Sequence, residues 1–191
     1  MSRYLTVLMA LVLAGCVSVA KMESGERSIG ERLQVTLSGA WNHVSAPGLG
    51  PAQTWTMEGL PVDQLLIYSG LKDGEAVHPT TAGMTDKRTF SFRSGMQPHE
   101  IAALFEGMLS RDGSTYKLTR LEPAAFGGEK GFRFEYALTR KIDNVQLSGV
   151  GYGTVSRGEL FALVYMAPRL AFFSRHAPIV EEIARSARLK G

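Results

Sequence analysis

The stretch 131–166, GFRFEYALTRKIDNVQLSGVGYGTVSRGELFALVYM, contains three largely apolar segments separated by two short polar turns. In the first segment, aromatic residues and leucine occupy alternate positions, and Arg133 and Glu135 lie between them. This period-two pattern is typical of a β-strand with one buried and one solvated face. The turns at 141–144 and 156–158 are short enough to join antiparallel neighbours. The stretch therefore predicts a meander of three strands, 131–139, 144–155 and 159–166.

Two details of this stretch refine the prediction. The segment LFALVY at 160–165 is apolar on both faces, which indicates a central strand. Gly149, Gly151 and Gly153 alternate inside the strand before it. A dinucleotide-binding loop would need its glycines between a strand and a helix. We therefore expect the three glycines to mark a place where an aromatic ring or another backbone approaches closely.

Further strands are predicted upstream of the meander. Apolar and polar residues alternate over 33–38, and the next strand is expected to end at Trp41-Asn42-His43, before a loop rich in proline and glycine at 45–52. The other segments with strand character are 53–57, 64–71 and 116–121. Residues 72–87 are polar and rich in turn-forming types, which predicts a long surface excursion.

Two helices are predicted around these strands. Pro98 and Glu100 suit the first turn of a helix that ends near Asp112. Its one-sided apolar stripe consists of Ile101, Leu104, Phe105, Met108 and Leu109. A second helical segment starts at Pro168 and is expected to break or kink at Pro178. Its buried stripe consists of Ile179, Val180, Ile183, Ala184 and Ala187.

The order of these elements predicts an α+β fold, in which helices pack on an antiparallel sheet of about six or seven strands. This order, with FALVYMAPRLAFF at 161–173 and VEEIARSARL at 180–189, resembles the PsbP and Mog1 group of α/β/α sandwich proteins over residues 33–189. Members of that group are mostly accessory and assembly factors of larger complexes. The resemblance therefore implies binding rather than catalysis.

The first sixteen residues have the layout of an export signal. Arg3 precedes a nine-residue apolar run at 5–13, which is too short to span a bilayer because a membrane helix needs about 20 residues. The sequence LAGC at 13–16 follows and resembles the lipobox of bacterial lipoprotein precursors. The resemblance implies cleavage between Gly15 and Cys16 and acylation of Cys16 by chains such as palmitate. The alternative is an ordinary secretory signal with an incidental cysteine.

This layout predicts three parts. Residues 1–15 would be removed as a signal peptide, 16–32 would form the lipidated N-terminus and a flexible tether, and 33–191 would form one periplasmic α+β domain. A tether is expected because 17–32 lacks helical or alternating periodicity. An aspartate after the cysteine resembles an inner-membrane retention signal in enteric-type bacteria. Val17 stands there instead, which favours the outer membrane, with the domain facing the periplasm.

Composition and motifs narrow the classes of function. The chain has 191 residues, 45% hydrophobic and 20% charged, which excludes disordered, collagen-like and multi-span membrane proteins. Its single cysteine excludes an internal disulfide framework and a multi-cysteine zinc site. Because the common hydrolase and nucleotide-binding motifs are absent, we expect a non-enzymatic protein without cofactor or metal. Its expected partners are membrane lipid, through Cys16, and an envelope protein; nucleic acid is not expected for an exported protein.

Two alternatives involve residues around the first proline-rich loop. Trp41 and Trp55 could line an apolar cleft that binds a small ligand or lipid, of a kind that the sequence does not specify. His43 could act as a general base with Asp63 or Glu58 in an envelope hydrolase. The bland alternative is that the tryptophans belong to the core, His43 bonds local backbone and the carboxylates are solvated.

Charge is divided unevenly along the chain. Residues 111–191 carry 13 Lys and Arg against 8 Asp and Glu, whereas 16–110 carry 7 against 10. A basic surface on an anchored domain could meet anionic headgroups, a glycan polymer or an acidic protein. The residues expected to form such a surface, if the last helix presents one, are Arg169, Arg175, Arg185 and Arg188. The alternative is that these side chains simply cover solvated faces.

Overall fold

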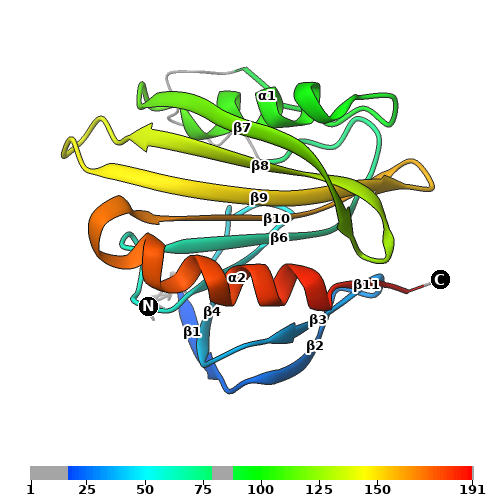
Figure 1. Ribbon diagram of the computed structural model, residues 1–191, viewed down its shortest axis with the longest axis horizontal. Helices are drawn as coiled ribbons and strands as arrows, with labels where there is room; N and C mark the ends of the chain where they lie inside the picture. Colours follow the sequence, from blue (N-terminus) through cyan, green and yellow to red (C-terminus); the bar gives the residue numbers. More distant parts are fainter. Residues whose placement is uncertain (1–16, 79–87, 191) are drawn as a thin grey trace, which may run out of the picture.

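The computed structural model describes residues 17–78 and 88–190. Its main sheet consists of β1 (Ser18–Met22), β4 (Trp41–Ser45), β5 (Gln53–Thr56), β6 (Gln64–Leu71), β7 (Thr115–Phe126), β8 (Glu129–Thr139), β9 (Gln146–Ser156) and β10 (Glu159–Pro168). All its pairs are antiparallel, in the order β1-β4-β5-β6-β10-β9-β8-β7 (Figure 1). The predicted meander is confirmed as β8, β9 and β10, with β7 paired to β8 at the edge of the sheet.

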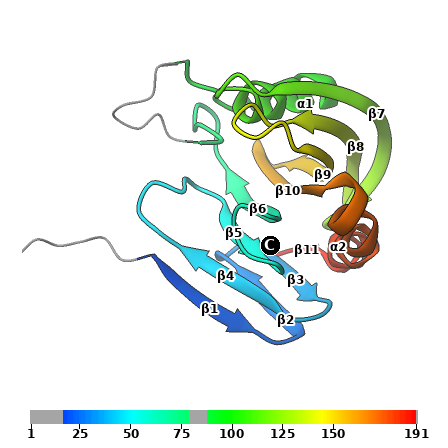
Figure 2. The ribbon, with the colours of Figure 1, turned by 90° about the vertical axis from the view of Figure 1, so that its left-hand side faces the viewer.

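A second, smaller sheet and the helices cover the main sheet. The small sheet has the order β11-β3-β2, built from β2 (Gly25–Ile29), β3 (Leu33–Leu37) and β11 (Arg188–Leu189). The helical segments are α1 (Pro98–Leu109), a π-helical turn η1 (Arg169–Phe173) and α2 (Ser174–Ser186). Helix α1 packs on one face of the main sheet, and α2 lies on the other face with β2 and β3 (Figures 1 and 2). The predicted α+β sandwich is confirmed.

Strand β10 shows why the centre of the sheet is apolar on both sides. Phe161, Leu163 and Tyr165 point into the core under α2, whereas Leu160 and Val164 point into the core under α1. All five are at most 2% exposed. The strand lies between β6 and β9, so its prediction as a central strand is confirmed.

The alternating glycines of β9 lie beneath aromatic rings of β8. The register pairs Phe134 with Gly151 and Tyr136 with Gly149. A Cβ built on Gly149 would lie 2.0 Å from Cζ of Tyr136, and one on Gly151 would lie 2.2 Å from Cζ of Phe134. The glycines are therefore required because the two rings occupy the space of their missing side chains, as the sequence predicted. The rings in turn pack against α1, where Phe134 stacks on Phe105 at 5.7 Å between centroids.

The predicted tether is wrong for most of its length. Residues 18–22 form β1, paired with β4, and residues 25–29 form β2, paired with β3. Strand β1 is an edge strand exposed on both faces apart from Met22, so no alternation marks it in the sequence. Backbone pairing, rather than burial of an apolar face, holds it in the sheet. These strands and the two-residue β11 raise the number of strands above the six or seven expected.

The helices largely follow their predictions. Helix α1 begins at Pro98, and its capping box joins Gln97 and Glu100. The second helical segment starts directly after Pro168, as expected. The predicted break at Pro178 is wrong, because α2 continues through it to Ser186. Pro178 is the fifth residue of α2, and because proline has no N–H, the helix loses there only the hydrogen bond to the carbonyl oxygen of Ser174.

Candidate functional site

The predicted apolar cleft at Trp41 and Trp55 is not found among the described residues. Trp41 is fully buried and Trp55 is 3% exposed, and both rings belong to the core under α2. The ring of His43 packs on Trp55, with 4.6 Å between centroids. The tryptophans therefore belong to the core, which was the alternative to a ligand-binding cleft.

The packing of His43 on Trp55 affects the pKa of the histidine. Burial against Trp55 lowers the pKa of His43 below its usual value of about 6.5, so the folded state favours the neutral ring. The neutral ring of His43 therefore adds to the free energy of unfolding above pH 6.5, and this stabilisation is lost as the pH falls below that value. We expect His43→Gln to flatten the pH dependence of the free energy of unfolding between pH 7 and 5. Urea titrations across this range test it, with exposed His99→Gln as the control; equal slopes for both variants would contradict it.

The predicted catalytic pairs of His43 with Asp63 or Glu58 are not supported by the geometry. Asp63 is 1% exposed and accepts hydrogen bonds from the Thr56 hydroxyl and from the backbone N–H groups of Met57 and Glu58. This carboxylate organises the loop between β5 and β6. Glu58 instead pairs with another histidine.

That histidine is His176, on the buried face of α2. Its Nδ1 lies 3.0 Å from the Tyr165 hydroxyl, and its Nε2 lies 3.2 Å from the Glu58 carboxylate, which also faces Arg175 at 3.7 Å. Burial, together with the nearby carboxylates Asp63 and Glu58, raises the pKa of the Tyr165 phenol. Because Tyr165 is fully buried, its hydroxyl offers no surface to a substrate. The contacts from Tyr165 to His176 and from His176 to Glu58 therefore connect α2 to β10 and to the β5–β6 loop.

Periodicity could have revealed His176. It stands four residues before Val180 and seven before Ile183, on the same helical stripe. A histidine on a buried stripe needs polar partners, and here they come from positions 11 and 118 residues away in the sequence.

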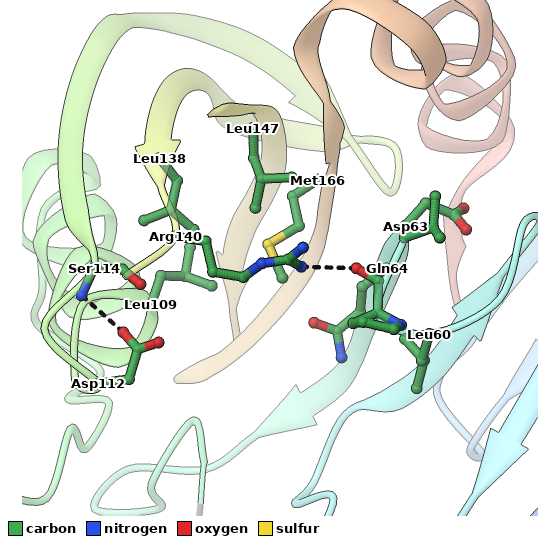
Figure 3. Close-up of a pocket in the computed structure, with 12 residues that line it drawn as sticks. Leu60, Asp63, Gln64, Leu109, Asp112, Ser114, Leu138, Arg140, Leu147 and Met166 are labelled. Carbon is green, nitrogen blue, oxygen red and sulfur yellow. Dashed lines mark hydrogen bonds between the residues drawn. The ribbon is translucent and has the colours of Figure 1, made fainter. Parts of the chain in front are cut away.

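An open pocket lies at one end of the main sheet, between the β5–β6 loop and the turns that precede β7 and β9 (Figure 3). It has a volume of about 320 Å³. Its apolar lining comes from α1, β8, β9, β10 and the β5–β6 loop: Leu109, Leu138, Leu147, Met166 and Leu60. A space of this size and lining can take an apolar side chain or a small apolar ligand.

Arg140 crosses the pocket (Figure 3). Its Nη1 donates to the carbonyl oxygen of Pro61 at 2.9 Å, and its Nε and Nη2 bind the carboxylate of Asp143. The Asp143 carboxylate raises the pKa of Arg140 through these hydrogen bonds, and Arg140 lowers the pKa of Asp143. Since the guanidinium is engaged on both sides, Arg140 joins the two loops around the pocket and its charge is largely neutralised.

Apolar side chains are exposed around the same end of the sheet. Ile142, in the β8–β9 turn, and Leu170, in η1, are each 87% exposed, and Leu60 is 42% exposed. The pairing of Leu147 with Pro168 places the β8–β9 turn and η1 at one end, and Gln64 with Met166 places the β5–β6 loop there too. We call Leu60, Ile142 and Leu170 the apolar end. Exposed apolar side chains at one end of a sheet are available for contact with another molecule.

The four arginines expected to form a basic surface lie on or near α2, but they are not equivalent. Arg185 pairs with Glu181 at 2.5 Å along the helix, and Arg175 faces Glu58. Arg188 donates to the backbone oxygens of Arg185 and Ala187. Arg169 lines a groove of about 470 Å³ between α2 and the β8–β9 surface. The structure thus brings two of the four beside acidic groups, and a basic surface remains a prediction.

Within residues 17–78 and 88–190, no group of three or more histidine, cysteine or acidic side chains is arranged to hold a metal ion. None of the helices in these two ranges is long and apolar enough to cross a membrane. The predicted cleavage and acylation sites, Gly15 and Cys16, lie outside the described residues.

Comparison with solved structures identifies the fold. Cyanobacterial PsbP (CyanoP) from Synechocystis sp. PCC 6803 matches with a TM-score of 0.59 and 14% identity, over 96% of this chain and 99% of that one. The fold is therefore PsbP-like. LpqN of Mycobacterium tuberculosis, which is involved in cell envelope biogenesis, matches at a TM-score of 0.40 and 10% identity, over 93% of this chain and 86% of that one. That second similarity is too loose to indicate a shared fold. No protein-family model and no curated protein matches the sequence.

Proposed function

We propose that this chain is a bacterial envelope lipoprotein that acts as a non-enzymatic accessory or assembly subunit. The observation that carries the proposal is the order of features at the start of the chain: Arg3, the apolar run at 5–13, two small residues, and the only cysteine at position 16. Acyl chains on Cys16 would hold the protein in the membrane. With Val17 after the cysteine, we place it in the outer membrane, facing the periplasm.

The accessory role rests on the surface rather than on the fold, because a fold by itself does not define a function. The apolar end presents Leu60, Ile142 and Leu170 to solvent, and Leu60 also lines the pocket that Arg140 crosses. Protein interfaces commonly have an apolar centre with a polar rim. We therefore assign the partner site to this end of the sheet, with an envelope protein as the partner.

The same pocket favours a second candidate function, the binding of a small apolar ligand. Its apolar lining offers such a ligand the kind of cleft that was predicted near Trp41 and Trp55. Native mass spectrometry of the protein purified from membranes distinguishes the two functions. A noncovalent ligand of constant mass that leaves when Met166→Trp fills the pocket would support the second function, and a mass equal to that of the acylated protein alone would contradict it.

Substitution of the apolar end tests the accessory role. We expect the double variant Ile142→Glu and Leu170→Glu to lose most of a stoichiometric protein partner captured by mild crosslinking in cells, since two charges would need dehydration in the interface. Both side chains are 87% exposed, so the fold should tolerate the change. Leu118→Glu, which alters a 38% exposed leucine on β7, is the matched control. Equal recovery of the partner by both variants, or no partner with the wild type, would contradict the proposal.

A further inference from the structure

The distance between Cys16 and the folded domain is very short. Strand β1 begins at Ser18, which pairs with Ser45, so only Val17 lies between the cysteine and the sheet. At about 3.3 to 3.6 Å per residue, two residues span about 7 Å at most. A lipid anchor on Cys16 would therefore attach to the domain with almost no slack.

The residues at this point of the surface are themselves uncharged, and the nearest charged side chains are Lys21 on β1 and Glu75, which lies beside Pro51. Val17 and Val19 are 64% and 61% exposed. The pairing of Ser18 with Ser45 brings the β4–β5 loop beside them, and residues 46–51 of that loop, APGLGP, contain no charged side chain. Figure 2 shows the start of β1 and this loop on the same side of the molecule. We call Val17, Val19 and residues 46–51 the N-terminal face.

We infer that the N-terminal face lies directly against the headgroup region of the bilayer, so that the lipoprotein is held in one orientation instead of swinging on a tether. The inference rests on the proposed acylation of Cys16. A link of one residue gives the face a very high effective concentration at the membrane, so weak apolar contacts are enough to hold it there. Uncharged backbone, two valines and Leu49 can enter the interface without the cost of dehydrating a charge.

Quenching of a fluorescent probe by the membrane tests this orientation. Leu49→Cys carries a bimane label in the purified, acylated full chain, which is placed in phosphatidylethanolamine–phosphatidylglycerol vesicles with a nitroxide on the lipid headgroup. We expect about half of the emission to be lost, because a face that enters about 5–10 Å into the interface lies within reach of the nitroxide. Lys117→Cys is the control, since it is exposed on β7, at the opposite edge of the main sheet.

A linker variant separates orientation from anchoring. Insertion of twelve Gly and Ser residues after Val17 gives a flexible span of about 20 Å. It should leave the protein in the vesicles but reduce quenching at Leu49 to the level at Lys117. Equal quenching at the two positions without the insertion would overturn the inference. A protein that is not acylated would not enter the vesicles at all. That result would refute the proposed acylation of Cys16 and not the orientation.

Discussion

Replacing Cys16 by serine is expected to move the protein from the membrane fraction to the soluble fraction of the envelope. A serine hydroxyl cannot form the thioether on which lipoprotein acylation depends. Each buried methylene contributes about 0.8 kcal/mol to membrane binding, so two or three acyl chains hold a protein almost permanently and their loss releases it. None of the helices in the described parts of the chain could take over by crossing the membrane.

Fractionation followed by immunoblotting measures this redistribution. The matched control is Ser18→Ala, a change at an exposed position two residues away that leaves the thiol in place. We expect the control to stay in the membrane fraction and the Cys16→Ser protein to leave it almost completely. A Cys16→Ser protein that remained bound would show that another part of the chain, or a partner, holds it there.

Substitution of Gly151 by alanine is expected to destabilise the domain by about 2 to 3 kcal/mol, which is typical of strong overpacking in a core. The new Cβ would lie 2.2 Å from both Cε1 and Cζ of Phe134. Phe134 cannot easily yield, because it is fully buried and stacks on Phe105 of α1. The strain would therefore fall on the centre of the core between the sheet and α1.

Urea unfolding followed by the fluorescence of the buried tryptophans measures this cost, with the Cys16→Ser protein as host. Gly95→Ala is the control, because a Cβ at Gly95 would meet nothing within 4 Å, and we expect it to change stability by about 0.5 kcal/mol at most. Adding Phe134→Leu to Gly151→Ala should cost less than the two single changes together, since the smaller side chain makes room for the new methyl group. Equal stability of Gly151→Ala and Gly95→Ala would contradict this account of the strand.

The elements that the sequence predicted well have either a regular apolar pattern or, like β10, an unbroken apolar run. Strand β8 alternates aromatic and charged residues, and α1 carries a clear apolar stripe, so the hydrophobic periodicity of each indicates its secondary structure. Strands β1 and β2 lack such a pattern, because most of their side chains are exposed and the backbone of a neighbouring strand holds them. Their pairing is a property of the whole sheet and leaves little trace in the local sequence.

The candidate site was harder to predict, because distant segments build it. The pocket draws Leu60 and Leu147 together from positions far apart in the chain, and no local motif joins them. The histidine that meets a carboxylate is His176, which finds Glu58 across the fold, whereas His43 lies against Trp55. Residue types alone suggested a histidine–carboxylate pair, but only the fold determines which histidine forms it.

The short link between Cys16 and β1 limits how far the domain could move from a membrane. A tether would let the domain search a wide volume above the membrane. With β1 beginning at Ser18, an anchor on Cys16 would instead hold the domain at the membrane surface. Pro51 of the N-terminal face lies beside Ser69–Leu71 at the end of β6, whereas Leu60 of the apolar end precedes the start of β6. The apolar end would therefore stay available to a partner while the N-terminal face meets the membrane.

The mass of the mature N-terminal peptide, measured on protein purified from membranes, tests the central claim most directly. The account predicts a peptide that begins at Cys16 and carries a diacylglyceryl group on the sulfur, with or without a third acyl chain on the amine. A peptide that begins at another residue, or one that contains an unmodified Cys16, would contradict it.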